Sequence, residues 1–594
     1  MRVRSLAAIL ALVIVAIAVH VTALGGWWLY DDPQLLIESI QQPLAGVFFD
    51  PSEYTHLAAH TFSPMQLASF KLDLFLHGLD PRLFYIHQLL AMILAAVFLY
   101  LLLRHYVPDL YAALGSAVFL TTWAAVYATR TLMIRHYVEG LVFALAAMLA
   151  WRRGGRWTIL ASVFYLLAML SKEVYATVPI FFVCQSRYEK RPWRELVSPV
   201  IAFIVFIAWR WYMTGLIGGY ASDVIRNQEV THFPYALWIH IAGPAPVWAF
   251  FVWAACIVIA LAMFIWRQRV RAVAFVVLAL IAMILPILPV ASNFEWRYSF
   301  AFVAFLVAVL TIAAGMSRQR WTIVVLILLF ATTLFTSLRQ RNYYQDLTRK
   351  GIELEGRWIW TQPKTAPSLA ARAPAWYLGG LAWLRKHEGN GDGPQAVFSR
   401  YAITVGMIDP ARIVAIDDGH VVPVTDSHLY GTAADWYAAR EHFDPNAPLT
   451  IELALRNHDA QWRLGPPAAR FIFLTDPGYT AIPIPPAGKQ RVPAAREQQF
   501  FRIVREEADG RWTVSPTLPV PAEGKVTVWR RLLKMKVLLD RHSDDFLESL
   551  PVRLDCSGGL IEENALDAEQ RDEHRDQVEA RLVTARELAR PVFK

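Results

Sequence analysis

The first 340 residues contain a succession of apolar runs, most of them long enough to cross a membrane. A helix that spans the hydrocarbon core of a bilayer needs about 20 predominantly apolar residues. We therefore expect a polytopic α-helical membrane protein with about eleven transmembrane helices. The expected spans lie near residues 5–30, 86–103, 109–128, 138–151, 158–171, 174–186, 196–216, 245–266, 272–290, 298–316 and 321–338.

Charged residues divide the 594-residue chain into two parts. Of its 106 Asp, Glu, Lys and Arg residues, 39 lie in 1–340 and 67 in 341–594. Ordinary globular domains are about 25% charged, so only the second part has their composition. The sequence predicts a transmembrane domain over 1–340 and a soluble domain over 341–594. Three cysteines are too few for a disulfide framework.

Lys and Arg predict the orientation of the spans, because cytoplasmic loops of membrane proteins carry an excess of both. With the N-terminus in the cytoplasm, the inner segments hold fifteen basic residues, and the longer outer loops hold seven. An odd number of spans then places 341–594 outside the cytoplasm. The net charge of +8 collects in these short inner loops, so it does not indicate a nucleic-acid partner. The inner residues are Arg2, Arg4, Arg104, Arg152, Arg153, Arg156, Arg187, Lys190, Arg191, Arg194, Arg267, Arg269, Arg271, Arg318 and Arg320.

The soluble part has the pattern of a mixed α/β domain. Short runs rich in β-branched and aromatic residues alternate with Pro and Gly, which is typical of strands. We expect a helix over 373–385 and a charged surface helix over 561–590. The expected strands cover 396–398, 402–405, 449–455, 470–474 and 525–529.

Two adjacent carboxylates, Asp31 and Asp32, follow the first apolar run and open a long outer loop at 31–85. Charged groups at membrane depth are costly and commonly mark function. Such a pair can act as a general base or bind a divalent cation. The alternative is that the pair, with Pro33, only ends the helix. We expect no other metal site.

Basic residues recur at the same membrane level as this acidic loop. Arg and Lys there suit a phosphate group held at the lipid boundary. Taken singly, each could instead extend its charge toward water or form a local pair, such as Lys172 with Glu173 or Arg297 with Glu295. The basic residues concerned are Arg130, Arg135, His136, Lys172, Arg210 and Arg297, and Glu173 belongs to the same candidate set.

Several motifs occur in an order that resembles a known family, the GT-C superfamily of membrane glycosyltransferases. The resemblance covers about the first 300 residues and is nearest to protein O-mannosyltransferase-like members, without their tetratricopeptide tail. The motifs are Tyr30-Asp31-Asp32-Pro33, His60-Thr61-Phe62-Ser63-Pro64, Ser69-Phe70-Lys71-Leu72-Asp73, Gly78-Leu79-Asp80-Pro81, Phe84 to Leu90, Leu170-Ser171-Lys172-Glu173 and Glu295-Trp296-Arg297-Tyr298.

The resemblance implies a transferase that takes a sugar from a polyprenyl-phosphate donor on the outer face of the membrane. Asp31 or Asp32 then acts at the reaction centre, and Lys172 and Arg297 hold the donor phosphate. We assign His60 and Asp73 to the acceptor side of the first outer loop. The acceptor is a protein or a glycan. The alternatives are a transporter or flippase of lipid-linked saccharides, and a ligase of such saccharides.

The expected compartment is a bacterial inner membrane. No Asn-x-Ser/Thr sequence occurs in the chain. The Arg-rich inner loops and the absence of a disulfide framework agree with that location.

Overall fold

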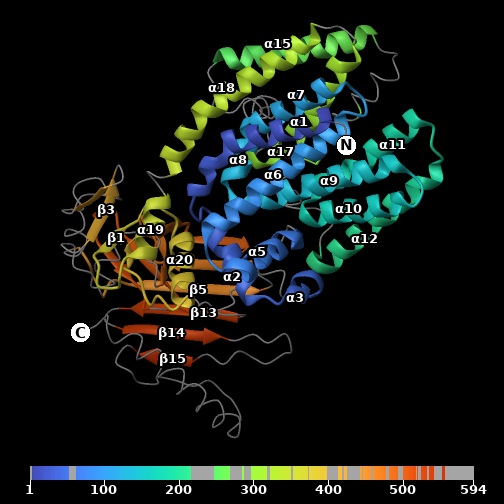
Figure 1. Ribbon diagram of the computed structural model, residues 1–594. Coiled ribbons are helices and arrows are strands. Elements are labelled where there is room, and N and C mark those ends of the chain that lie inside the picture. The colour runs from blue at the N-terminus through green and yellow to red at the C-terminus, as the bar shows by residue number, and fades with distance from the viewer. Residues whose placement is uncertain are drawn as a thin grey trace. The chain divides into compact units, whose positions relative to one another are not determined.

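The computed structural model contains two compact units, Met1–Thr348 and Arg349–Lys594, each described separately below (Figure 1). The sequence-based division lay at 340. The structure describes residues 3–51, 62–215, 247–267, 278, 284–286, 296–317, 321–348, 352–371, 373–397, 413–417, 420–423, 442–444, 446–456, 459–476, 481–491, 500–516, 518–519, 524–531, 534–540 and 552–555.

The first unit is helical throughout its described part. The helices that lie in the apolar runs are α1 (Val3–His20), α6 (Pro81–Leu103), α7 (Asp109–Thr121), α8 (Trp123–Arg130), α9 (Arg135–Arg153), α10 (Trp157–Ser171), α11 (Val178–Glu189), α12 (Val197–Thr214), α15 (Val247–Arg267), α17 (Trp296–Met316) and α18 (Thr322–Thr348). Other helices join them: η1 (Val21–Gly25), α2 (Asp32–Gln41), α3 (Leu44–Phe49), α5 (Pro64–His77), η2 (Leu132–Ile134), η3 (Glu173–Thr177) and η4 (Trp193–Leu196).

Seven helices in the described part are long and apolar enough to cross a membrane, or eight if a bent pair counts as one span. This confirms a polytopic helical membrane protein, although eleven spans were expected. The run at 158–171 forms α10, which has only 15 residues. The run at 174–186 divides into η3 and the 12-residue α11. Most of the run at 272–290 lies outside the described residues.

The bent pair is α7 and α8, which meet at 55° inside the run expected at 109–128. Thr122 causes the bend because it leaves the helical conformation, with φ −69° and ψ 152°. Its hydroxyl donates to the carbonyl of Phe119 at 2.7 Å and accepts from the N–H of Ala125 at 3.4 Å. A threonine that caps one helix while ending another interrupts an apolar run without a change in hydropathy.

Helix α9 occupies the centre of the first unit and packs against α6 and α10 (Figure 1). Gly140 permits a close approach at this position, because an added Cβ would lie 2.4 Å from the ring of Tyr175. Further along the helix, Trp151 is fully buried and stacks on Phe182 with ring centroids 4.6 Å apart. Residues near the start of α9 are therefore held on a rigid, closely packed element.

The described part of the second unit contains two helices and three sheets. The helices are α19 (Leu354–Thr361) and α20 (Ala375–His387). The strand order is β2-β1-β3-β4 in the first sheet, β11-β10-β7-β8 in the second, with β12 also on β10, and β15-β14-β13-β5-β6-β9 in the third. The strands are β1 (Ser368–Ala370), β2 (Ala396–Val397), β3 (Ile413–Asp417), β4 (His420–Pro423), β5 (Leu449–Arg456), β6 (Asp459–Gly465), β7 (Arg470–Asp476), β8 (Ala481–Ile484), β9 (Ala487–Arg491), β10 (Phe500–Glu506), β11 (Trp512–Val514), β12 (Leu518–Pro519), β13 (Gly524–Arg531), β14 (Lys534–Asp540) and β15 (Val552–Asp555).

Both faces of the second sheet pack against hydrophobic side chains, as strand β7 shows. Alternate side chains of a strand point to opposite faces. Ile472 and Leu474 enter one core, which the first sheet also lines, and Phe471 enters another core, which it shares with Leu449 and Ile451 of the third sheet.

Most elements expected in the second part are present. Strands β2, β5, β7 and β13 cover the predicted runs at 396–398, 449–455, 470–474 and 525–529, and α20 covers most of 373–385. Helix α20 connects β1 to β2, which pair in parallel with Leu369 opposite Ala396. The C-terminal domain therefore contains helices and sheets, as expected. The strand predicted at 402–405 and the charged helix predicted at 561–590 lie outside the described residues.

Candidate functional site

The site begins at Tyr30, where the chain turns sharply after the first helix. Tyr30 has a φ of 48°, the left-handed region that side chains other than glycine and asparagine rarely adopt. Asp31 follows as the residue before α2, and Pro33 occupies the first turn of that helix. The two adjacent carboxylates consequently enter different surroundings.

Asp32 is fully buried. Its Oδ2 accepts a hydrogen bond from the N–H of Leu29 at 2.8 Å. Burial raises the pKa of Asp32 well above its usual range, and the neighbouring Asp31 adds to the rise. Asp32 therefore ties the start of α2 to the backbone of Leu29.

Asp31 is only partly buried and faces a cation. Burial raises the pKa of Asp31, and the positive charge of Arg297 acts against that rise. Arg297 lies at the start of α17, where its guanidinium is 5.2 Å from the ring centroid of Tyr298. The structure thus brings together an acidic and a basic candidate that are 266 positions apart in the sequence.

Lys172 and Arg210 meet at a shared carboxylate. Lys172 is the extended residue that ends α10, and its Nζ is 3.4 Å from Oε2 of Glu173. Arg210 of α12 is almost fully buried, and its Nη1 is 3.3 Å from Oε1 of the same carboxylate. The local pair expected of Lys172 and Glu173 is therefore present, but it includes a second cation from a distant helix.

Electrostatics connects this group with Arg297. Burial lowers the pKa of Lys172, Glu173 raises it, and the charges of Arg297 and Arg210 lower it further. Glu173 is pulled the other way: burial raises its pKa, but Lys172 and Arg210 together bring it below the usual range. We call Lys172, Arg210 and Arg297 the cation cluster.

His136 and Tyr137, in the first turn of α9, border the cation cluster. The Nζ of Lys172 is 5.6 Å from the ring centroid of Tyr137, and the charges of Lys172 and Arg297 both act on His136. Tyr137 was not among the sequence candidates. Its signal was available, since it directly follows Arg135 and His136 at the start of a predicted helix.

Two of the described carboxylates accompany the cation cluster. Glu173 lies beside Lys172 and Arg210, and the charge of Arg297 acts on Asp31. Guanidinium and ammonium groups gathered in this way are suited to bind an anion such as a phosphate or a carboxylate.

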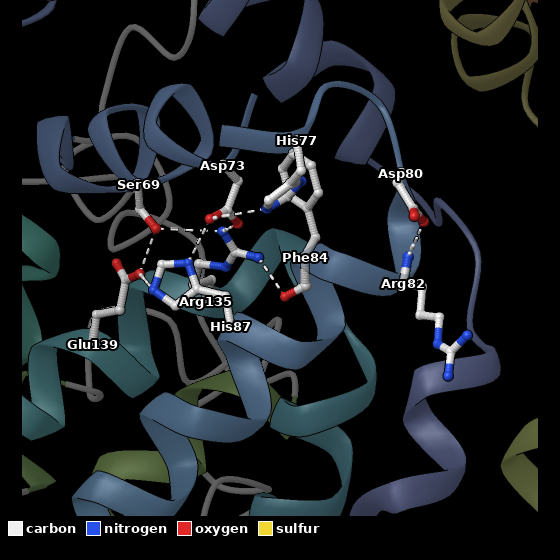
Figure 2. Close-up of polar contacts among 9 residues, drawn as sticks. All are labelled: Ser69, Asp73, His77, Asp80, Arg82, Phe84, His87, Arg135 and Glu139. Atoms are coloured by element: carbon white, nitrogen blue, oxygen red, sulfur yellow. Dashed lines mark hydrogen bonds and ion pairs between the residues drawn. The ribbon is translucent and has the colours of Figure 1, made fainter. Parts of the chain in front are cut away.

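Arg135 and Asp73 do not join this cluster, because they pair with each other (Figure 2). Arg135 has no exposed surface, and its other terminal nitrogen donates to the carbonyl of Phe84 at 2.8 Å. The expectation that Arg135 holds the donor phosphate and that Asp73 serves the acceptor is not supported by their positions. Both side chains are engaged inside the protein.

Arg130 also has an internal partner. It ends α8, is buried, and donates to the hydroxyl of Thr22 in η1. This contact joins α8 to the segment that follows α1. Its assignment to the donor phosphate stays a prediction.

His60 lies outside the described residues, so its assignment to the acceptor side also stays a prediction. The same holds for a divalent cation at Asp31 and Asp32. Within the described ranges, no three His, Cys, Asp or Glu side chains are grouped to hold a metal ion. Asp32 is occupied by backbone donors, and Arg297 already supplies a positive charge beside Asp31.

No protein-family model matches this chain, and no curated protein matches it significantly. Among solved structures, it is similar to ArnT from Cupriavidus metallidurans bound to undecaprenyl phosphate, with 14% identity over 68% of this chain and 88% of that chain and a TM-score of 0.40. It is also similar to the apo state of the same protein, with 12% identity over 69% of this chain and 88% of that chain and a TM-score of 0.40. At these values the likeness assigns neither activity nor substrate to this chain.

Proposed function

We propose that this chain is a membrane glycosyltransferase of the GT-C type. It transfers a sugar from a polyprenyl-phosphate donor to a hydroxyl of a protein or glycan acceptor. The observation that carries the proposal is that Lys172 and Arg210 share the carboxylate of Glu173, while the charge of Arg297 acts on both Lys172 and Asp31. Such a reaction needs a carboxylate base and a phosphate-binding group within one site.

Asp31 is the general base in this proposal. It takes the proton of the acceptor hydroxyl as the hydroxyl oxygen forms a bond to C1 of the sugar. The bond between C1 and the phosphate oxygen breaks, and its electron pair stays with the polyprenyl phosphate. Charge on that phosphate grows during the step, so cations placed at its oxygens stabilise the transition state more than the ground state.

The cation cluster receives the donor phosphate. Arg297 links the base with the phosphate-binding group, because its charge acts on both Asp31 and Lys172. Glu173 holds Lys172 and Arg210 in place. A lipid-linked donor cannot leave the bilayer, which accounts for a site built from residues at the ends of membrane helices.

Asp32 has a structural part in this proposal. Its carboxyl is fully buried and bonded by backbone groups, so an acceptor hydroxyl cannot reach it. We place the site on the outer face of a bacterial inner membrane, with the N-terminus in the cytoplasm and the second unit outside.

The test compares Asp31→Asn with Asp32→Asn in purified protein supplied with a polyprenyl-phosphate sugar. Losing a general base costs about 10²- to 10⁴-fold in rate. We expect that loss in Asp31→Asn, with donor binding retained. The matched Asp32→Asn variant should keep a larger share of the rate per folded molecule.

Normal transfer by Asp31→Asn would refute the role of the base. Donor binding without any transfer by the wild-type protein, together with movement of the donor between bilayer leaflets, would instead identify a flippase. A ligase would transfer a whole lipid-linked saccharide where this proposal expects a single sugar.

A further inference from the structure

The first three residues of helix α9 contact different parts of the structure. Arg135 turns toward α5, whereas His136 and Tyr137 border the cation cluster. The base and the phosphate-binding group come from segments far apart in the chain. Their relative position therefore depends on how α2 is held against the first turn of α9.

The connection from α2 to α5 is made by Lys71. Its Nζ donates to the carbonyl of Ser39 at 2.5 Å and to that of Gln42 at 2.6 Å. These carbonyls lie at the C-terminal end of α2, where a positive charge is favourable. Helix α2 is thus fixed to α5 at its C-terminal end, and at its other end Asp32 is bonded to the backbone of Leu29.

The connection from α5 to α9 is made by Asp73 and Arg135 (Figure 2). The guanidinium of Arg135 also donates to Ser69 at 3.3 Å and to the carbonyl of Phe84 at 2.8 Å. Its carbon lies 4.8 Å from the ring centroid of Phe70. Because the buried guanidinium of Arg135 must keep these partners, it restricts how α5 and α9 pack against each other.

Further polar groups complete the same junction, as Figure 2 shows. Nδ1 of His87 is 2.7 Å from Oδ1 of Asp73, and Nε2 of His87 is 3.7 Å from Oε1 of Glu139. Ser69 donates to that same Glu139 oxygen. The i, i+4 spacing of Ser69, Asp73 and His77 places all three on one face of α5. The sequence contained this spacing, but its meaning depends on the partners supplied by α6 and α9.

We propose that the ion pair between Asp73 and Arg135 is a latch that positions Asp31 opposite the cation cluster. This inference rests on the proposed function above. Asp73 and Arg135 are positioning residues that touch neither donor nor acceptor. Arg135 has no exposed surface through which a phosphate could reach it.

The test uses the full-length protein and three variants: Asp73→Leu, Arg135→Met and the double variant. Asp73→Leu leaves the buried guanidinium of Arg135 without its carboxylate, and Arg135→Met leaves Asp73 with only His87 and His77 beside it, whereas the double change replaces the ion pair with apolar side chains. We expect at least a tenfold loss of kcat in each single variant, with donor KM within about twofold of wild type, and recovery of most of that loss in the double variant. The rate is counted per folded molecule.

A second measurement does not need an enzyme assay. Amide hydrogen exchange over Asp32–Gln41 should be faster in each single variant than in wild type and should return toward wild type in the double variant. Lys172→Ala serves as the control, because it should change donor KM and leave this exchange unaltered. If wild type shows no transfer, the proposed function fails, and the exchange result still decides whether the latch exists.

Three results would overturn the inference. The first is a double variant that is as inactive as Arg135→Met and binds a polyprenyl phosphate more weakly, because Arg135 would then hold the phosphate itself. The second is a normal kcat per folded molecule in both single variants. The third is unchanged exchange over Asp32–Gln41 in all three variants.

Discussion

Asp31 and Asp32 are adjacent in the chain, but their carboxylates lie in different surroundings. Tyr30, in its left-handed conformation, and the start of α2 send Asp32 into the protein, where backbone donors bind it. Asp31 stays at the edge of the cation cluster. A carboxylate that works as a base must reach its substrate, and only Asp31 meets that condition.

The pH dependence of the transfer rate should reflect the ionisation of Asp31. Burial raises the pKa of this acid, and a base must be ionised, so the rate should fall as the pH drops through a value above the usual Asp range. Arg297 works against the rise. Arg297→Gln should therefore move this acidic limb to higher pH, which a profile of kcat/KM against pH would show. Arg82→Gln is the control. A limb that moves to lower pH in Arg297→Gln would contradict the pairing.

The cation cluster can be tested by comparing a cation with its carboxylate. A hydrogen bond to a charged group is worth about 1.5–3 kcal/mol, so Lys172→Ala and Arg297→Ala should each raise the donor KM about 10- to 100-fold. Glu173→Gln removes negative charge from the same site, so donor KM should stay equal or fall. If Glu173→Gln weakens donor binding as much as Lys172→Ala does, the group is a structural ion pair. Donor titrations on the three purified variants measure this.

At two places in the first unit, the backbone conformation of one residue changes the direction of the chain. Thr122 bends the run at 109–130, and Tyr30 turns the chain into α2. A left-handed conformation costs a residue other than glycine about 1–2 kcal/mol. The chain accepts this cost directly before the proposed base, where such strain commonly accompanies function.

Replacement of Tyr30 should therefore depend on backbone freedom more than on size. Tyr30→Gly and Tyr30→Val both remove the ring, but only glycine adopts a positive φ freely. We expect Tyr30→Val to be less stable than Tyr30→Gly by about 1–2 kcal/mol. Thermal unfolding of both variants measures the difference. Equal stability would show that the turn relaxes to an ordinary conformation when the ring is lost.

At the scale of the whole molecule, the seven apolar helices confirm that the first unit is a polytopic membrane domain, while its orientation stays a prediction. The prediction rests on fifteen basic residues in the inner segments against seven in the outer loops. The proposed outer site needs this orientation, because Asp31 and the cation cluster must lie on one side.

Reporter fusions test the orientation. Fusions after Arg194 and Arg271 should report the cytoplasm, and fusions after Asp50 and Pro374 should report the outside. Paired reporters that are active on opposite sides of the membrane make the measurement internally controlled. A cytoplasmic signal after Pro374 would remove the second unit from the outer face.

The sequence by itself predicted the helical membrane domain and, in the second part, the runs that form β2, β5, β7 and β13. These features follow from hydropathy and period, which are local properties of the chain. It also named Asp31, Lys172 and Arg297 as candidates, because charges at membrane depth are rare.

Only the tertiary structure decided which candidates meet. Arg135 and Asp73 were expected to touch different substrates, yet they bind each other across 62 positions. Arg210 and Lys172 share Glu173, and Asp31 faces Arg297 while Asp32 does not. A capping threonine likewise bends the apolar run at 109–128, which hydropathy shows as continuous. The sequence shows which side chains are charged. The partner of each charge depends on how distant helices pack, and local sequence patterns do not contain that information.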